Sequence, residues 1–257
     1  MLELEKAEKN CNIINNITIS NSNVSIGSCC SDCTVGNGGG EDGVDSIDRY
    51  PFDPNNPYSG VGAIHKLLTE KILLHLENHP VDSWEAAFNV CVTVLRNEGF
   101  VITDTLALRN KVAEILSDTS RDDYGVMISN LPINTKYIDV LQGLKDMITL
   151  NPLDPFIVIN KNTKTAAANI IGITTDNVLT NRDAAASLSF CSTLQSSAYL
   201  WLREIADDSV YAVAKENVGR VILADTIGSA DGYLSRGVVG AIIKGVTVSV
   251  CKVVEIS

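Results

Sequence analysis

Histidine is scarce in this sequence, with three residues among 257. His65, His75 and His79 fall in one short stretch, so any nucleophile that needs an imidazole base must recruit one of them. His75 and His79 have the four-residue spacing of two metal ligands on a helix. However, Leu76 stands where a metalloprotease helix carries its glutamate. The spacing instead favours the last turn of a helix, where imidazole groups bond to free carbonyls.

A second CxxC pair is also lacking. The single pair, Cys30 and Cys33, lies in a stretch rich in Ser and Gly, whereas a structural zinc site usually needs two pairs and a redox pair opens a helix beside a sheet. The cysteine count is odd and the gaps are long, which argues against a disulfide framework. We therefore expect no structural metal. The seven cysteines are Cys11, Cys29, Cys30, Cys33, Cys91, Cys191 and Cys251.

The N-terminus, MLELEKAEKN, is charged where a secretory signal would be apolar. No uninterrupted apolar run approaches the roughly 20 residues of a membrane span. The glycine-rich stretch 36–40 is not followed by the Lys and Ser or Thr of a phosphate-binding loop. These features predict a cytoplasmic protein (or a virion component, if the source is viral) that is not secreted and binds neither a membrane nor a cofactor.

Acidic residues outnumber basic ones, and the net charge is −11. The electrostatic field of the whole protein therefore does not favour binding of nucleic acid. Nine acids and three bases give residues 1–60 a charge of −6, and 22 acids and 17 bases give residues 61–257 a charge of −5. Residues 1–60 are also dominated by Asn, Ser, Gly and Asp, the composition of a segment without a core. The sequence therefore predicts a flexible acidic N-terminal arm over 1–60. Residues 61–257 are expected to form a single helical core domain.

Apolar residues recur at helical spacing from Val61 onward, which predicts a mainly α fold. Capping spacing at Asp82–Glu85 and the later Gly99 bound one helix. The other expected helices cover 62–78, about 104–117, the stretch after Asn134 with Tyr137, Leu141, Leu144 and Ile148 inward, 183–205, and the stretch after Asp207 and Asp208.

The C-terminus changes period. Val246, Val248 and Val250 alternate with Thr247 and Ser249, and Val254 and Ile256 continue the pattern, which predicts a short C-terminal strand. Such a strand must pair with the short apolar run 156–159, with the arm, or with another subunit.

Candidate ligand-binding residues are few, and no catalytic residues are predicted. The adjacent acids Asp122 and Asp123 are expected to be helix caps or solvated turns, since neighbouring helix residues do not face one another. Lys161 and Lys164 in the polar stretch 160–165, with Arg182 farther along, form the best candidate for phosphate contacts with single-stranded RNA. The alternative interpretation is an exposed polar loop, because aromatic stacking residues are missing nearby.

The long arm, the terminal strand and the small-residue helix faces favour a structural protein that forms a homo-oligomer through the arm and the strand. A helical coat or nucleocapsid subunit that packages RNA is the most concrete version. The alternative is a helical adaptor that binds partner proteins or peptides. An enzyme with an unrecognised site is third.

Overall fold

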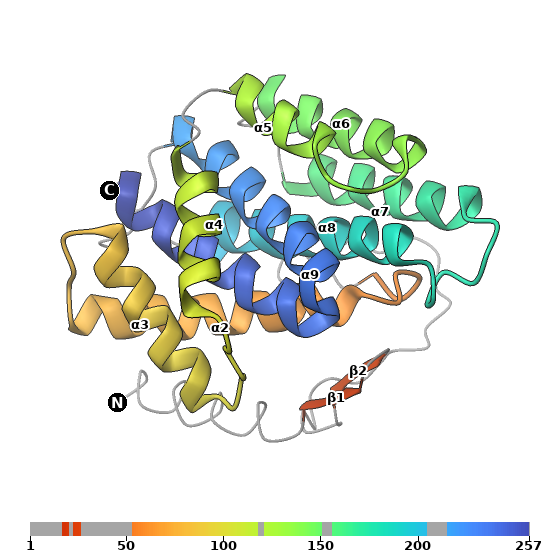
Figure 1. The fold of residues 1–257 in the computed structure, drawn as a ribbon. Coiled ribbons are helices and arrows are strands. Elements are labelled where there is room, and N and C mark those ends of the chain that lie inside the picture. Colours follow the sequence, from red (N-terminus) through yellow and green to blue (C-terminus); the bar gives the residue numbers. More distant parts are fainter. Residues whose placement is uncertain are drawn as a thin grey trace, which may run out of the picture.

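The computed structural model describes residues 17–20, 23–26, 53–117, 121–150, 156–204 and 215–256. β1 (Ile17–Ser20) pairs antiparallel with β2 (Asn23–Ile26). From residue 53 on, the regular elements of the described chain are helical, as the mainly α prediction expects (Figure 1). They are α2 (Ser59–Asn78), α3 (Trp84–Asn97), α4 (Thr105–Ser117), α5 (Arg121–Ser129), α6 (Thr135–Leu150), α7 (Phe156–Ile173), α8 (Arg182–Tyr199), a π-helical turn η2 (Leu200–Glu204) and α9 (Lys215–Ile256).

Helix α8 is the centre of the bundle and packs against α2, α7 and α9 (Figure 1). Its residues from Ala184 to Tyr199 are all buried, so the helix has no solvated face. The sequence from Ala184 to Leu202 contains no Asp, Glu, Lys or Arg, which makes this complete burial possible. Small side chains let the neighbours approach closely. A Cβ atom on Gly62 of α2 would lie 2.2 Å from the Ser192 carbonyl oxygen.

Helix α9 is two helices that meet at a sharp bend. Arg236 and Gly237 have non-helical backbone angles, and Gly237 adopts a φ of +63°, which favours glycine. The two halves then run back along each other (Figure 1). A Cβ atom on Gly240 would lie 2.2 Å from the Gly232 carbonyl oxygen, so these backbones are in contact.

Among the described residues, one helix, Asn217–Ile256, is long and apolar enough to cross a membrane, judged by length and composition alone. Its mean hydropathy is 1.8. In this structure 78% of that apolar window is buried inside the bundle. A core helix of a bundle meets the same length and hydropathy criteria, so the property indicates burial and no more.

Several predicted helix boundaries are confirmed. The helix start at residues 82–85 is confirmed, but its cap is Ser83 rather than Asp82, the first residue of the predicted capping box: Ser83 accepts a hydrogen bond from the Ala86 amide at 3.3 Å. Gly99 follows α3 with a φ of +87°, as a C-terminal glycine does. Asp104 caps α4 by accepting from the Ala107 amide at 2.8 Å. The inward stripe predicted for α6 is buried, and it comprises Tyr137, Leu141, Leu144 and Ile148.

The predicted C-terminal strand is wrong, because residues 246–256 are the end of α9. Valines suggested a strand since β-branched residues favour sheets, yet Val246, Val248 and Val250 are wholly buried on a helix. A helix that is covered on all sides shows no 3.6-residue period to identify it. For a similar reason the apolar run at 156–159, expected as a strand or buried turn, is the first turn of α7.

The predicted division at residue 60 stays a prediction. Of residues 1–60, the structure describes the side chains of 53–60, and these pack on the core. Asn56 donates from its side chain to the Leu188 carbonyl at 3.0 Å, and Tyr58 is 3% exposed. The CxxC cysteines, the glycine-rich stretch 36–40, and Asp207 with Asp208 lie outside the described residues.

Candidate functional site

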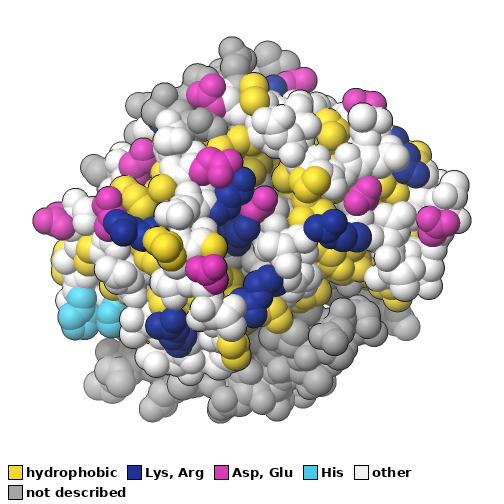
Figure 2. All heavy atoms as spheres, viewed as in Figure 1, with side chains coloured by type: hydrophobic (Ala, Val, Ile, Leu, Met, Phe, Trp, Pro, Cys, Tyr) yellow, Lys and Arg dark blue, Asp and Glu magenta, His cyan; other side chains and the backbone are white. Residues whose placement is uncertain are grey.

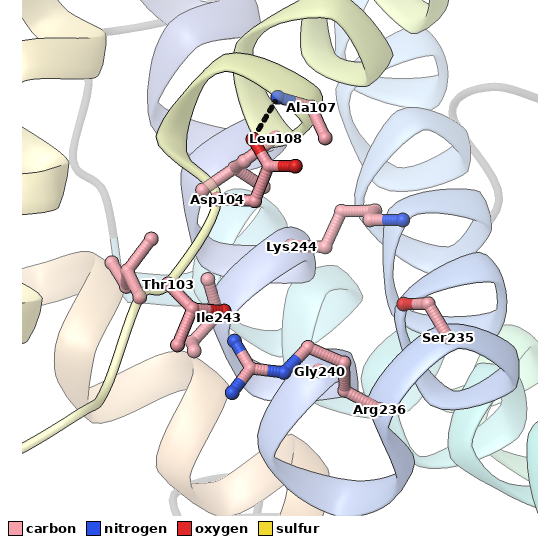
Figure 3. A pocket seen from close by; sticks show the side chains of 10 residues that line it. Thr103, Asp104, Ala107, Leu108, Ser235, Arg236, Gly240, Ile243 and Lys244 are labelled. Carbon is pink, nitrogen blue, oxygen red and sulfur yellow. Dashed lines mark hydrogen bonds between the residues drawn. The ribbon is translucent and has the colours of Figure 1, made fainter.

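A surface pocket lies between α4 and the bend of α9. Its volume is about 170 Å³. Figure 3 shows the α4 side, with Asp104 and Leu108, facing the bend, with Ser235 and Arg236. The remaining lining residues are Ile102, Thr103, Ala107, Gly240, Ile243 and Lys244. The site therefore depends on the break in α9, because the bend places residues 235–236 and 240–244 around one hollow.

Two arginines fix the loop that forms the pocket wall. Arg236 Nη1 donates to the Val101 carbonyl at 3.0 Å. Arg96 Nη2 donates to the Ile102 carbonyl at 3.3 Å and to Thr105 Oγ1 at 3.1 Å. Each guanidinium has five N–H donors, so both keep donors to spare. Within the described part of the chain, neither arginine has an ion pair with a carboxylate.

Two exposed aliphatic residues, Val101 and Leu106, adjoin in sequence the pocket-lining residues Ile102 and Ala107. Val101 is 64% exposed and Leu106 is 67% exposed, the two highest values among the large apolar residues of the described chain. Figure 2 shows hydrophobic side chains interspersed with Lys, Arg, Asp and Glu over the part of the face that α4 and the bend of α9 occupy. Exposed aliphatic groups beside a preformed hollow are typical of a binding surface rather than of random exposure.

The two lysines near the pocket are paired with a carboxylate. Lys244 Nζ contacts Asp231 Oδ2, and Lys111 Nζ lies 3.8 Å from Asp231 Oδ1. Asp104 caps α4 with one carboxylate oxygen and keeps its negative charge in the pocket lining. A bound group would therefore meet the positive charge of Arg236 and the negative charge of Asp104, with the positive charge of Arg96 on the adjoining loop.

A second polar cluster is buried at the centre of the bundle around Asp225. Three side chains donate to its Oδ2 atom: Ser197 Oγ at 2.5 Å, Ser249 Oγ at 2.9 Å and Trp201 Nε1 at 3.3 Å. The donors come from α8, the second half of α9 and η2, so one carboxyl group joins three segments. Burial raises the pKa of Asp225 to about 7, although these three hydrogen bonds oppose the rise.

His65 of α2 faces this carboxyl group, with Nε2 3.9 Å from Asp225 Oδ2. Burial lowers the pKa of His65 to about 4, and the Gly245 carbonyl opposes that shift. Neither ring nitrogen of His65, nor Asp225 Oδ1, has a hydrogen-bond partner among the described protein atoms. A buried water between these groups would satisfy them.

The predicted phosphate contacts are not brought together by the structure. Lys161 and Lys164 are exposed on α7, and residues 160–165 belong to that helix rather than to the expected polar loop. Arg182 opens α8 and donates from Nη2 to the Leu234 carbonyl at the end of the first half of α9. RNA binding at these residues stays a prediction.

The predicted arrangement of His75 and His79 is confirmed. They stack at the end of α2 with ring centroids 4.7 Å apart, and His79 Nδ1 lies 3.2 Å from the His75 carbonyl oxygen. Among the residues that the structure describes, no group of three or more His, Cys, Asp or Glu side chains suits a metal ion.

Sequence reasoning missed Arg96, Arg236 and Asp225. The two arginines are isolated in sequence, and only folding places them beside one loop. Asp225 had a signal, because it is the one charged residue between Val221 and Ala230, in an otherwise apolar or small-residue stretch. Charged groups at such positions are buried with partners or serve a function. Comparison of the chain with protein-family models, curated proteins and solved structures found no match.

Proposed function

We propose that the protein is a binding module whose pocket between α4 and the bend of α9 holds an extended acidic peptide with an aliphatic side chain. The observation that carries this proposal is a largely apolar hollow beside a loop to which two arginines with spare donors bond. The exposed Val101 and Leu106 adjoin, in sequence, the lining residues Ile102 and Ala107. This makes the adaptor interpretation the better supported of the functions that the sequence suggested.

The size of the pocket favours a peptide side chain as the anchor. Pockets for drug-sized ligands measure roughly 300–1,000 Å³, and this pocket measures about 170 Å³. Burial of one Val, Leu or Ile side chain contributes about 1.5–3 kcal/mol. A carboxylate that accepts from a guanidinium forms a charge-assisted hydrogen bond, worth about 1.5–3 kcal/mol. Because hydrogen bonds already fix the 101–105 loop, little ordering is needed on binding.

The test uses the full chain and a fluorescent octapeptide of Asp and Gly with one central Leu. We expect saturable binding by anisotropy that weakens as salt increases, because exposed charges are screened. Ala107→Phe should abolish binding by filling the pocket from an exposed helix position. Ala168→Phe, the same change at an exposed position of α7, should not alter it. Equal binding by both variants would exclude the pocket.

Self-assembly is the second candidate function. What supports it is the exposed aliphatic pair on α7, where Ile157 is 53% and Val158 is 38% exposed. A contact through this face would place Lys161 and Lys164 of the same helix near the interface. Sedimentation velocity of the wild type and of Ile157→Asp tests it. A monomer at high concentration in the wild type would rule it out.

A further inference from the structure

We propose that the pocket between α4 and the bend of α9 binds the C-terminal residue of a partner peptide, one with an aliphatic side chain and a free α-carboxylate. The inference rests on the proposed function and deepens it, because it names the part of the peptide that enters the pocket. Its basis is the division of the lining into a buried apolar floor and a polar rim that carries two opposite charges.

The floor of the pocket consists of Ile102, Leu108 and Ile243, whose side chains are buried. These residues come from the loop before α4, from α4 itself and from the second half of α9, so three segments close the floor. The pocket volume of about 170 Å³ leaves room for one aliphatic side chain rather than for a longer stretch of peptide. The floor therefore selects a single apolar residue.

The rim of the pocket consists of Thr103, Asp104, Ser235 and Arg236, which are exposed. Figure 3 shows the Asp104 carboxylate and the Arg236 guanidinium at opposite ends of this group of lining residues. A ligand that satisfies both must present a hydrogen-bond acceptor to Arg236 and a donor to Asp104. A ligand that carries acceptors alone would satisfy one end and be repelled at the other.

Arg236 is the receptor for the carboxylate. Its Nη1 atom donates to the Val101 carbonyl at 3.0 Å, which fixes the guanidinium against the loop. Its Nη2 and Nε groups form no hydrogen bond with the described residues, so two donor groups remain for one carboxylate. The other cation of the lining, Lys244, contacts Asp231 and is neutralised there. The positive end of the pocket is therefore Arg236.

Asp104 is the acceptor at the other end. Its Oδ1 atom accepts from the Ala107 amide at 2.8 Å and caps α4. Its Oδ2 atom accepts no hydrogen bond from the described residues, so this oxygen is left for a donor on the ligand. Because Asp104 repels a second carboxylate, an N–H group is the favoured partner at this end.

A C-terminal residue carries the three required groups on one Cα atom. Its α-carboxylate meets Arg236, its backbone N–H meets Asp104, and its aliphatic side chain covers the floor. An internal residue of an extended peptide has no carboxylate of its own, and the acidic side chains of its two neighbours point to the opposite face of the chain. The end of a peptide thus matches the pocket better than its middle does.

The first experiment varies the peptide and leaves the full chain unchanged. Four octapeptides of Asp and Gly, labelled at the N-terminus with a fluorophore, carry one Leu at the C-terminus or at the centre and end in a free acid or an amide. In fluorescence anisotropy, the terminal-Leu free acid should bind at least about tenfold more tightly than its amide, because it alone has the α-carboxylate beside Leu. The central-Leu acid and amide should differ by less than about twofold, because their end group is remote and screened.

The outcomes separate this inference from the proposed function. If the terminal-Leu free acid binds no more tightly than its amide, the C-terminal residue is not what the pocket recognises. Binding of the central-Leu peptides in that case leaves the proposed function standing. Absence of saturable binding by all four peptides would overturn both.

The second experiment assigns the positive end of the pocket. Arg236→Gln should weaken binding of the terminal-Leu free acid by at least about tenfold and leave its amide nearly unchanged, because only the acid uses the guanidinium. Arg96→Gln is the matched control, since Arg96 also bonds to the loop but does not line the pocket. It should not discriminate between acid and amide. The same discrimination by both variants would overturn the role of Arg236.

Asp104→Asn tests the other end of the pocket. Asparagine keeps an oxygen that caps α4 and replaces the free oxygen with an amide donor. Both terminal-Leu peptides should bind this variant about three- to tenfold more weakly, since both lose the acceptor for their N–H group. Unchanged or tighter binding would overturn the assignment, because it would show that Asp104 accepts nothing from the ligand. Far-UV circular dichroism checks that each variant is folded.

Discussion

His65 Nε2 lies 3.9 Å from Asp225 Oδ2, and both side chains are excluded from solvent. The pKa of the carboxyl group is raised to about 7 and that of the imidazole is lowered to about 4, each chiefly by burial. At pH 7 the histidine is neutral and the acid is close to half protonated. Because the histidine is neutral, the two groups do not form an ion pair at this pH.

Asp225 and His65 should give the free energy of unfolding opposite pH dependences, which offset each other in the wild type. Asp225 contributes stability that is present below its ordinary pKa of 3.8 and is lost as pH rises to about 7. His65 contributes stability that is present above its ordinary pKa of 6.5 and is lost as pH falls to about 4. Between these limits each term changes by up to about 1.4 kcal/mol per pH unit.

Replacing one of the two residues should reveal the pH dependence that the other contributes to stability. In Asp225→Asn the histidine term remains, so the free energy of unfolding should fall, relative to the wild type, as pH decreases from 6.5 to 4.5. In His65→Gln the carboxyl term remains, and the relative free energy should fall as pH increases over the same range. Urea unfolding at three pH values measures both. Parallel pH profiles for the three proteins would show that the pair does not titrate as described.

The contact between Gly232 and Gly240 predicts a large penalty for any added side chain. Because a Cβ atom on Gly240 would lie 2.2 Å from a backbone oxygen, Gly240→Ala must separate the halves of α9. We expect a loss of at least about 1–3 kcal/mol in the free energy of unfolding. Gly143→Ala is the matched control, since no atom lies within 4 Å of its added Cβ. It should stabilise α6 by about 0.5–1 kcal/mol.

Breaking the ion pair of the buried Lys252 should cost more stability than breaking the exposed ion pair of Lys111. Its ammonium group is wholly buried, donates to the Leu116 carbonyl at 3.2 Å and contacts Glu255 Oε2 at 2.6 Å. Glu255→Gln removes the charge beside that buried ammonium and should cost about 1–3 kcal/mol in urea unfolding. Glu114→Gln removes the exposed partner of Lys111 and should cost less than about 1 kcal/mol. Equal costs would mean that the buried charge is compensated elsewhere.

If the protein packages RNA, replacing the two exposed lysines and replacing Arg182 should have different effects on stability. Lys161→Glu with Lys164→Glu should lower the ratio of absorbance at 260 nm to that at 280 nm in purified particles, without changing the melting temperature, because both side chains are exposed. Arg182→Gln should also lower the free energy of unfolding by about 0.5–1.5 kcal/mol, because it loses the bond to the Leu234 carbonyl. A protein free of nucleic acid before any mutation would contradict the prediction.

The sequence by itself determined the helices that have one solvated face and ordinary caps. Ser83, Asp104 and Gly99 mark the ends of α3 and α4 because capping is a local interaction between a side chain or a left-handed residue and the nearest turn. The inward stripe of α6 is readable for the same reason, since one face meets water and the other does not.

Tertiary structure decided the elements that are buried on every side and the sites built from distant residues. The second half of α9 appeared to be a strand because its valines are covered all round, so burial erased the helical period. Arg96 and Arg236, which are 140 positions apart in sequence, bond to the same loop. Asp225 accepts from donors on α8, η2 and the second half of α9. Such contacts depend on how helices cross, and local spacing along the chain carries no record of them.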